Sequence, residues 1–231
     1  METYKFAYLI GTLSIGLPIW LVLFLLRYDI RHKILLMSIL GAVAGPISEY
    51  WYIQDYWRPQ TFTGWPISIE DVLFGFFAAG IASVIYEELF GKRYAKRHTR
   101  THHHLMLLFP ILVVAFYLHN HFNPGFSINS IYASSVAFLV SATAIILNRK
   151  DLLVDSVISG LLFGAFFFLA YQAILNFYPE IFIRWWLLQN ITGVTLLAVP
   201  IEEIIWGFTL GMFAGPLYEF YSGLTFKKGA R

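Results

Sequence analysis

Long apolar runs, separated by short charged or turn-rich stretches, constrain this chain more than any other feature. A helix needs about 20 apolar residues to cross the hydrocarbon core of a bilayer. A backbone inside lipid must satisfy its own hydrogen bonds, so each such run predicts a transmembrane helix. The runs cover roughly residues 6–26, 34–53, 66–90, 105–120, 126–147, 152–175 and 194–222. We therefore expect an all-α, polytopic membrane protein with seven transmembrane helices.

The composition narrows the classes of function. The chain is 58% hydrophobic and only 13% charged, whereas soluble domains carry about a quarter charged residues. It has no cysteine, so disulfides and thiolate metal sites are excluded. No G-x-G-x-x-G fingerprint is present, and the net charge of +2 is too small for nucleic-acid binding. We expect no metal, no cofactor and no nucleic-acid partner.

The basic residues predict the orientation in the membrane. With seven spans, 13 of the 16 Lys and Arg residues fall on one side, leaving Lys5, Arg58 and Arg184 on the other. The basic side is normally cytoplasmic, which predicts an outside N-terminus and a cytoplasmic C-terminus in the plasma membrane. The first run is long enough to stay in the membrane as an anchor. The basic side holds Arg27, Arg31, Lys33, Lys92, Arg93, Lys96, Arg97, Arg100, Arg149, Lys150, Lys227, Lys228 and Arg231.

Aromatic residues concentrate in the predicted outer loops. Trp and Tyr favour the boundary between membrane and water, so we interpret this group as an interfacial aromatic belt. Its members are Trp51, Tyr52, Tyr56, Trp57, Trp65, Tyr178, Trp185 and Trp186.

An internal repeat relates the third and seventh runs. Residues 69–87 and 201–219 are identical at seven of 19 positions with a fixed offset of 132, and Asp71 faces Glu203. This predicts two parallel three-helix repeats, residues 1–95 and 123–231. Residues 96–122 would then form a basic cytoplasmic loop and a connecting helix that restores the orientation of the second repeat.

Carboxylates inside apolar runs are costly and are candidates for function. Two carboxyls held together in a dry site can act as an acid and a base without a metal or cofactor. The two acidic pairs, Glu70 with Asp71 and Glu202 with Glu203, lie at matching positions of the repeat. Glu87 and Glu219 follow 17 residues later, roughly 25 Å along a helix, and are expected at the cytoplasmic interface.

A structural interpretation competes for each of these acids. Ser68 and Asp71 fit a capping box, and Pro200 can open a helix whose dipole favours acids in its first turn. The apolar residues 194–199 would instead place the second pair deeper in the membrane. Asp155 is more often a polar contact between helices, and Glu49 fits either a site acid or an interfacial anchor.

The second acidic pair lies in a recognisable motif. Pro200-Ile201-Glu202-Glu203, followed by an aromatic-rich run, resembles the Pro-x-Glu-Glu motif of the lycopene cyclase domain family. Members of that family are membrane-integral carotenoid cyclases, found as two three-helix subunits or as a fused chain, and the layout here is similar to the fused form. The family's acids carry over onto Glu202 and Glu203. They carry over less closely onto Glu70 and Asp71, since Pro66 stands four residues before Glu70.

The resemblance implies an isomerase that cyclises an acyclic polyene end to an ionone ring by acid/base chemistry, without redox. Glu202 or Glu203 would act as the acid, with Glu70 or Asp71 as base or electrostatic support. The expected partners are membrane lipid and a hydrophobic polyene or isoprenoid. The candidates for substrate binding, through cation–π contacts or a carboxylate, are Phe74, Phe76, Trp206, Phe208 and Glu49.

Two other classes remain open. One is a non-catalytic or divergent isoprenoid-binding or carrier protein with the same fold, in which the acids are caps and helix contacts. The other is an intramembrane glutamate protease, because His119 and Asn123 form an H-x-x-x-N element beside the Glu-Glu pair. That class requires an arginine where this chain has Gly207. A cyclase predicts that both acidic pairs converge on one apolar cavity, which the other classes do not require.

Overall fold

A computed structural model describes residues 4–96 and 103–226 and is mostly helical. Part of the predicted basic loop and tail lies outside the described residues, namely Arg97, His98, Arg100, His102, Lys227, Lys228 and Arg231. The helices are α1 (Ala7–Gly11), η2 (Thr12–Gly16), α2 (Leu17–Leu26), α3 (Arg31–Asp55), α4 (Ile69–Leu89), η3 (His103–Leu107), α5 (Leu108–Phe122), η4 (Pro124–Phe126), α6 (Ser130–Asn148), η5 (Lys150–Leu152), α7 (Leu153–Phe177), α8 (Ile181–Trp185), η6 (Leu188–Asn190) and α9 (Ile201–Ser222). The strands are β1 (Tyr94–Lys96), β2 (Thr195–Leu196), β3 (Val199–Pro200) and β4 (Leu224–Phe226).

Six helices of the described chain are long and apolar enough to cross a membrane. They are Ala7–Leu26, Arg31–Asp55, Ile69–Leu89, His104–Phe122, Ser130–Asn148 and Lys150–Phe177. They correspond to the first six predicted runs, so the chain is an α-helical membrane protein. The total of seven and the duplication stay predictions.

The seventh predicted run differs from the expectation in two ways. Its helix, α9, has 22 residues but is not among the six apolar candidates. Fourteen of those residues are buried, and a helix surrounded by protein tolerates polar residues that lipid would not. The expectation that residues 194–199 belong to the span is wrong. They form part of the β2–β3 hairpin, whose turn residues Leu197 and Ala198 have positive φ angles of 47° and 69°.

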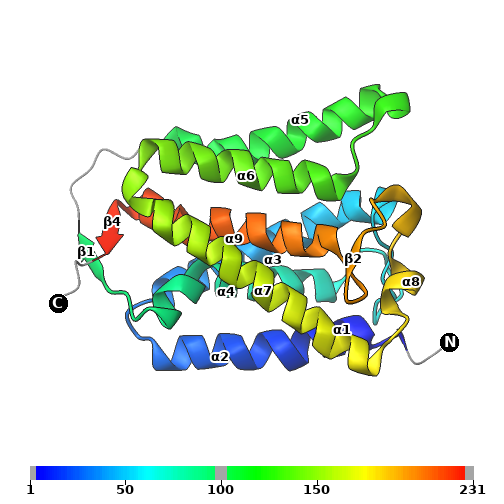
Figure 1. Cartoon of the computed structure of the whole chain (residues 1–231), viewed down its shortest axis with the longest axis horizontal. Helices are drawn as coiled ribbons and strands as arrows, with labels where there is room; N and C mark the ends of the chain where they lie inside the picture. The colour runs from blue at the N-terminus through cyan, green and yellow to red at the C-terminus, as the bar shows by residue number, and fades with distance from the viewer. Residues whose placement is uncertain (1–3, 97–102, 227–231) are drawn as a thin grey trace.

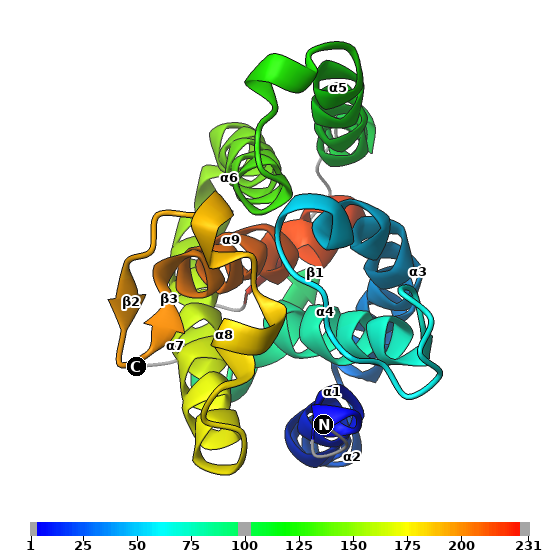
Figure 2. The same cartoon turned by 90° about the vertical axis from the view of Figure 1, so that its right-hand side faces the viewer.

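The helices form a bundle with α4 and α9 at its centre (Figure 2). Helix α3 packs along α4, α7 and α6 pack on α9, and α5 lies outside α6 (Figure 1). Glycines permit the two closest crossings: a Cβ on Gly41 would lie 2.1 Å from the Gly75 oxygen, and a Cβ on Gly211 would lie 2.5 Å from the Ser159 oxygen. Gly41 and Gly45 form a G-x-x-x-G pattern, as do Gly160 and Gly164 of α7. Small residues at this spacing are typical of membrane helices that approach closely.

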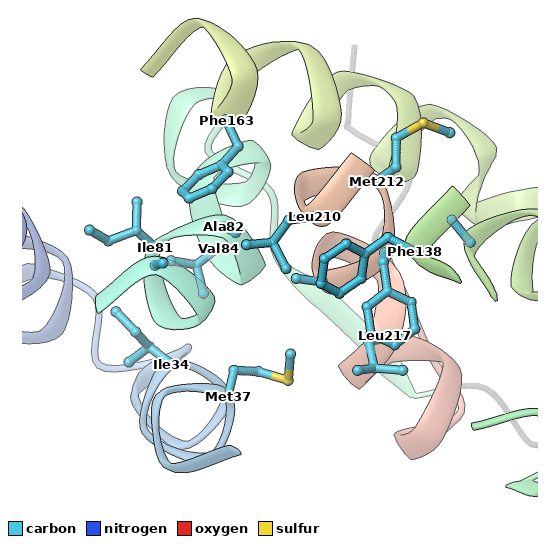
Figure 3. Close-up of a cluster of buried hydrophobic side chains, with 14 of the residues drawn as sticks. Ile34, Met37, Ile81, Ala82, Val84, Phe138, Phe163, Leu210, Met212 and Leu217 are labelled. Atoms are coloured by element: carbon cyan, nitrogen blue, oxygen red, sulfur yellow. The ribbon is translucent and has the colours of Figure 1, made fainter. Parts of the chain in front are cut away.

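The core is a continuous apolar cluster at the meeting of these helices. Ile34 and Met37 of α3, Ile81 of α4, Phe138 of α6 and Phe163 of α7 converge in Figure 3. Residues of α9 complete the cluster, among them Leu210, Met212 and Leu217. Side chains from five helices therefore hold the bundle together.

The two ends of the bundle differ in charge. We name them the Glu202 end, which includes α8 and the β2–β3 hairpin, and the Lys33 end, which includes β1 and β4 (Figure 1). Basic residues gather at the Lys33 end: Arg27 donates to the Lys92 carbonyl at 3.0 Å, and Arg149 to the Leu224 carbonyl at 2.8 Å. Basic residues that are far apart in the sequence, such as Arg27 and Lys92, therefore lie together at one end of the bundle.

The predicted second span began at residue 34, which would leave Lys33 in a loop. In the structure, Lys33 instead lies inside a helix. Helix α3 begins at Arg31, and Lys33 is only 1% exposed. Its ammonium lies 2.5 Å from Glu87 and 2.7 Å from Glu219, which supply the opposite charge that a buried lysine requires. The two glutamates are fully buried within the bundle at this end.

Candidate functional site

The first acidic pair lies at the start of α4, and its two members face different surroundings. Asp71 closes the predicted capping box, accepting from the Ser68 backbone N–H at 2.7 Å. Its other oxygen accepts from the Tyr8 hydroxyl of α1 at 3.0 Å. Glu70 faces the preceding loop, where it accepts from the Phe62 backbone N–H at 2.5 Å and the Ser68 hydroxyl at 2.5 Å. The first acid therefore fixes a loop, while the second reaches into the bundle.

In the second pair, in the first turn of α9, one acid likewise contacts a loop and the other points into the bundle. Glu202 accepts from the Thr192 N–H at 2.9 Å, from its hydroxyl at 2.6 Å and from the Tyr132 hydroxyl at 2.9 Å. Glu203 points inward and accepts from the Tyr56 hydroxyl and from the Trp186 indole, the latter at 2.7 Å. The capping interpretation thus describes only part of each pair's contacts.

Tyr56, which follows the end of α3, shows the electrostatics around Glu203. Burial and the Glu203 carboxylate together raise the pKa of the Tyr56 phenol well above its ordinary value. The phenol therefore stays protonated and remains a hydrogen-bond donor to Glu203 at any physiological pH.

Glu49 of α3 is a third buried acid at this end of the bundle, and it is 3% exposed. One carboxylate oxygen accepts from the Trp57 indole at 3.0 Å. The other has no donor among the described residues. A buried oxygen without a donor is a natural place for a proton. Glu49 therefore lies buried within the bundle, where it remains a candidate site acid.

Three neighbouring aromatic rings connect these acids. The rings of Tyr8 and Trp57 have centroids 5.2 Å apart, and those of Trp57 and Trp186 are 5.1 Å apart. Tyr8, Trp57 and Trp186 each donate their polar hydrogen to a different carboxylate, those of Asp71, Glu49 and Glu203. We call these three rings the aromatic wall. Behind it lie carboxylates from both predicted repeats.

The aromatic wall faces an apolar cleft with a cavity volume of about 90 Å³ between the first helix, α4, α7 and α8. Thr12, Ile15 and Gly16 of the π-helical turn η2 contribute to it, and such turns often mark functional sites. The cleft is lined by Ala7, Tyr8, Gly11, Thr12, Ile15, Gly16, Trp57, Phe74, Phe77, Ala78, Ile81, Phe163, Phe166, Phe167, Ala170, Tyr171, Ile174, Ile181, Trp185 and Trp186.

The structure separates the predicted substrate-binding aromatics. Phe74 lines the cleft. Trp206 lies behind it, 6.1 Å from the Phe74 ring, with its indole donating to the Tyr52 hydroxyl at 2.9 Å. Phe76 packs against Trp20 with ring centroids 5.1 Å apart, and Phe208 fills the contact between α9 and Gly164 of α7. Trp206, Phe76 and Phe208 are not among the residues that line the cleft.

The interfacial belt was in part a wrong interpretation. Tyr56, Trp185 and Trp186 are 3–4% exposed and belong to a buried cluster. Two loops at the Glu202 end interlock: the Arg58 N–H donates to the Trp185 carbonyl at 2.7 Å, and the Leu187 N–H to the Tyr56 carbonyl at 2.8 Å. Loop residues therefore close the Glu202 end of the cleft. The adjacent Trp185-Trp186 pair was the sequence signal for this, but alone it fits an interface equally well.

The protease alternative has little support in this geometry. His119 lies exposed near the end of α5, with its ring nitrogen 3.1 Å from the Phe126 carbonyl. The groups that reach Glu202 and Glu203 come from tyrosine, tryptophan and threonine residues. A protease would need its histidine beside the glutamates.

One comparison with known proteins bears on this site. Residues 129–221 match the family model described as lycopene cyclase. The match runs from α6 through α9 and includes Glu202, Glu203 and Trp186, so the resemblance seen in the motif is confirmed over this part of the chain. No curated protein and no solved structure matches the chain.

Proposed function

We propose that this protein cyclises the end of an acyclic, lycopene-type polyene within the membrane. One observation carries the proposal: the three rings of the aromatic wall face one apolar cleft, and each is hydrogen-bonded to a different buried carboxylate. The cleft accepts a hydrocarbon, the rings face a developing cation, and the carboxylates supply and remove protons. The family match supports the same chemistry.

The reaction requires one proton to enter and one to leave. A carboxylic acid protonates the terminal C1=C2 bond, and the C5=C6 bond then attacks the resulting tertiary cation. A carboxylate removes a proton from the new ring, so the product has the same formula as the substrate. The enzyme is accordingly an isomerase, and the chemistry draws on no oxidant.

We assign the acid to the Glu49–Asp71 pair and the base to Glu203. Glu49 has a buried oxygen without a donor among the described residues, where the proton of the acid can reside. Glu203 accepts from Tyr56 and Trp186, which stabilise its ionised form. This reverses the order expected from the motif, where the second pair held the acid.

The aromatic wall, Glu70 and Glu202 have supporting roles. The π faces of Tyr8, Trp57 and Trp186 stabilise a cation by about 0.5–2 kcal/mol each. Glu70 and Glu202 hold the outer loops closed over the cleft through Phe62 and Thr192. They keep the wall in place and water out of the reaction.

We also propose that the chain spans the membrane seven times with the Lys33 end in the cytoplasm. The basic residues at that end support this orientation. Reporter fusions at both termini test it: a cytoplasmic N-terminus would contradict it.

The function is tested by expressing the chain in a lycopene-accumulating bacterium and separating the pigments by chromatography. We expect γ- or β-carotene from the wild type, and none from Glu49→Gln, Asp71→Asn or Glu203→Gln at equal protein level. Glu180→Gln is the matched control, since Glu180 is exposed and pairs only locally with Arg184. Unchanged lycopene with well-inserted wild-type protein would refute lycopene as substrate and favour the binding or carrier alternative.

A further inference from the structure

A second group of buried charged residues lies at the Lys33 end, away from the cleft. We call it the Lys33 cluster: Lys33, Glu87, Tyr94, Asp155 and Glu219. The Lys33 ammonium and the Tyr94 hydroxyl each hydrogen-bond one oxygen of Glu87 and one of Glu219, at 2.5–2.8 Å. Asp155 of α7 faces the same two glutamates and accepts from the Ser159 hydroxyl at 3.1 Å. None of the proposed cyclase chemistry uses these residues.

Three carboxylate oxygens of the cluster have no hydrogen-bond donor among the described residues. Glu87 Oε2, Asp155 Oδ2 and Glu219 Oε2 are buried and have no hydrogen-bond donor in the part of the chain that the structure describes. The three side chains are at most 1% exposed. A buried acceptor without a donor is costly, and here three occur together from three different helices.

The charges are also unbalanced. Three carboxylates and one ammonium carry a net charge of −2 when all are ionised, in a region removed from water. A divalent cation would bring this sum to zero. Carboxylate oxygens are the ligands that Ca²⁺ and Mg²⁺ prefer.

The geometry fits such an ion. One oxygen from each of Glu87, Asp155 and Glu219 lies within 4.8 Å of the other two. A point between three atoms so placed is at most about 2.8 Å from each, because 4.8 divided by √3 is 2.8. Ca²⁺ binds oxygen at about 2.3–2.6 Å, so a small inward movement of the side chains completes the contacts. Mg²⁺ would require a larger one.

We propose that Glu87, Asp155 and Glu219 bind a hard divalent cation, with Ca²⁺ the best fit in size. The ion joins α4, α7 and α9 at the Lys33 end. The sequence predicts no metal, and these three acids are far apart in it. The site is independent of the proposed cyclase function.

Binding to the full-length protein tests the site directly. The chain is purified in detergent, stripped with EDTA and titrated with Mn²⁺, followed by electron paramagnetic resonance, with Ca²⁺ and Mg²⁺ as competitors. We expect one Mn²⁺ per chain, displaced more readily by Ca²⁺. At a concentration one hundred times Kd, Ca²⁺ should raise the thermal midpoint by about 5–10 °C.

Variants locate the ion. Asp155→Asn removes one ligand without touching the contacts of Lys33 or Tyr94, and should weaken Mn²⁺ binding at least about tenfold. Glu88→Gln is the matched control, since Glu88 adjoins Glu87 but pairs with Arg27 outside the cluster. Absence of stoichiometric Mn²⁺ in the wild type, with the same midpoint in EDTA and Ca²⁺, would overturn the proposal and mean that the carboxyls share protons. Binding that is equal in wild type and Asp155→Asn would overturn it too.

Discussion

Gly45 of α3 links the packing of the bundle to the geometry of the proposed site. A Cβ built on Gly45 would lie 2.2 Å from the backbone oxygen of Asp71. The helices therefore touch where α3 carries Glu49 and α4 carries Asp71, so that the glycine sets the spacing of the two acids. Gly45→Ala should push α4 away from α3 and disturb that pair.

The magnitude follows from the overlap. Carbon and oxygen atoms in proteins rarely approach within 3.0 Å, so a Cβ 2.2 Å from the Asp71 oxygen requires a shift of about 1 Å. Overpacking of this kind costs about 1–3 kcal/mol, partly offset by about 1 kcal/mol of helix propensity gained by alanine. We expect a net destabilisation of up to about 2 kcal/mol. A displacement of 1 Å at reacting groups can cost a factor of about 100 in rate.

Thermal unfolding in detergent and pigment chromatography measure the two effects on the same variant. Gly125→Ala is the control, because a Cβ there meets nothing within 4 Å. Gly45→Ala should unfold at a lower temperature than the control and form cyclised product about 100-fold more slowly. If the two variants unfold and cyclise alike, the close contact and its role in spacing the acids are both refuted.

Three further substitutions separate individual contacts. Trp186→Phe keeps the ring but removes its hydrogen bond to the Glu203 carboxylate, worth about 1.5–3 kcal/mol, and should slow cyclisation about 10–100-fold at equal protein level. Lys33→Met leaves two buried glutamates without their counter-charge and should cost about 3–5 kcal/mol in detergent unfolding, whereas a loss under 1 kcal/mol would contradict the buried ion pairs. Arg27 lowers the pKa of Asp29, so this pair stabilises the folded state above pH 4 or so and loses that effect as the pH falls through the lowered pKa. Because Asp29 is 44% exposed, Asp29→Asn should cost less than about 1 kcal/mol at pH 7, and a difference from wild type that persists at pH 2 would contradict the ion pair.

The transmembrane helices were predictable because their signal is local. Transfer of apolar side chains into lipid depends on composition within a window, and α3, α4, α6 and α7 end within a few residues of the predicted runs. This reasoning failed for residues 194–200, which form a hairpin. Val194, Leu196 and Leu197 are apolar but exposed, and the break is set by backbone conformation at Leu197 rather than by hydropathy.

Of the candidate site, only the acids could be predicted from the sequence. The apolar runs and the internal repeat identified the two carboxyl pairs, and the capping box and Pro200 indicated helix starts there, where α4 and α9 begin. The partners of these acids come from elsewhere in the chain: Tyr8 lies 63 residues from Asp71, and Tyr56 lies 147 residues from Glu203. Pairings over such distances depend on how the loops interlock. No window of sequence contains that information.

Helix geometry explains why the two acids of each pair contact different parts of the protein. Successive residues on an α-helix point about 100° apart, so two adjacent carboxyls cannot both face the same cleft. In both pairs the first acid turns to the loop, at Phe62 or Thr192, and the second turns to the interior. The proposed cyclisation uses one acid and one base. With one inward-facing carboxyl in each pair, the proposed site takes Asp71 from the first pair and Glu203 from the second, so both halves of the chain contribute to it.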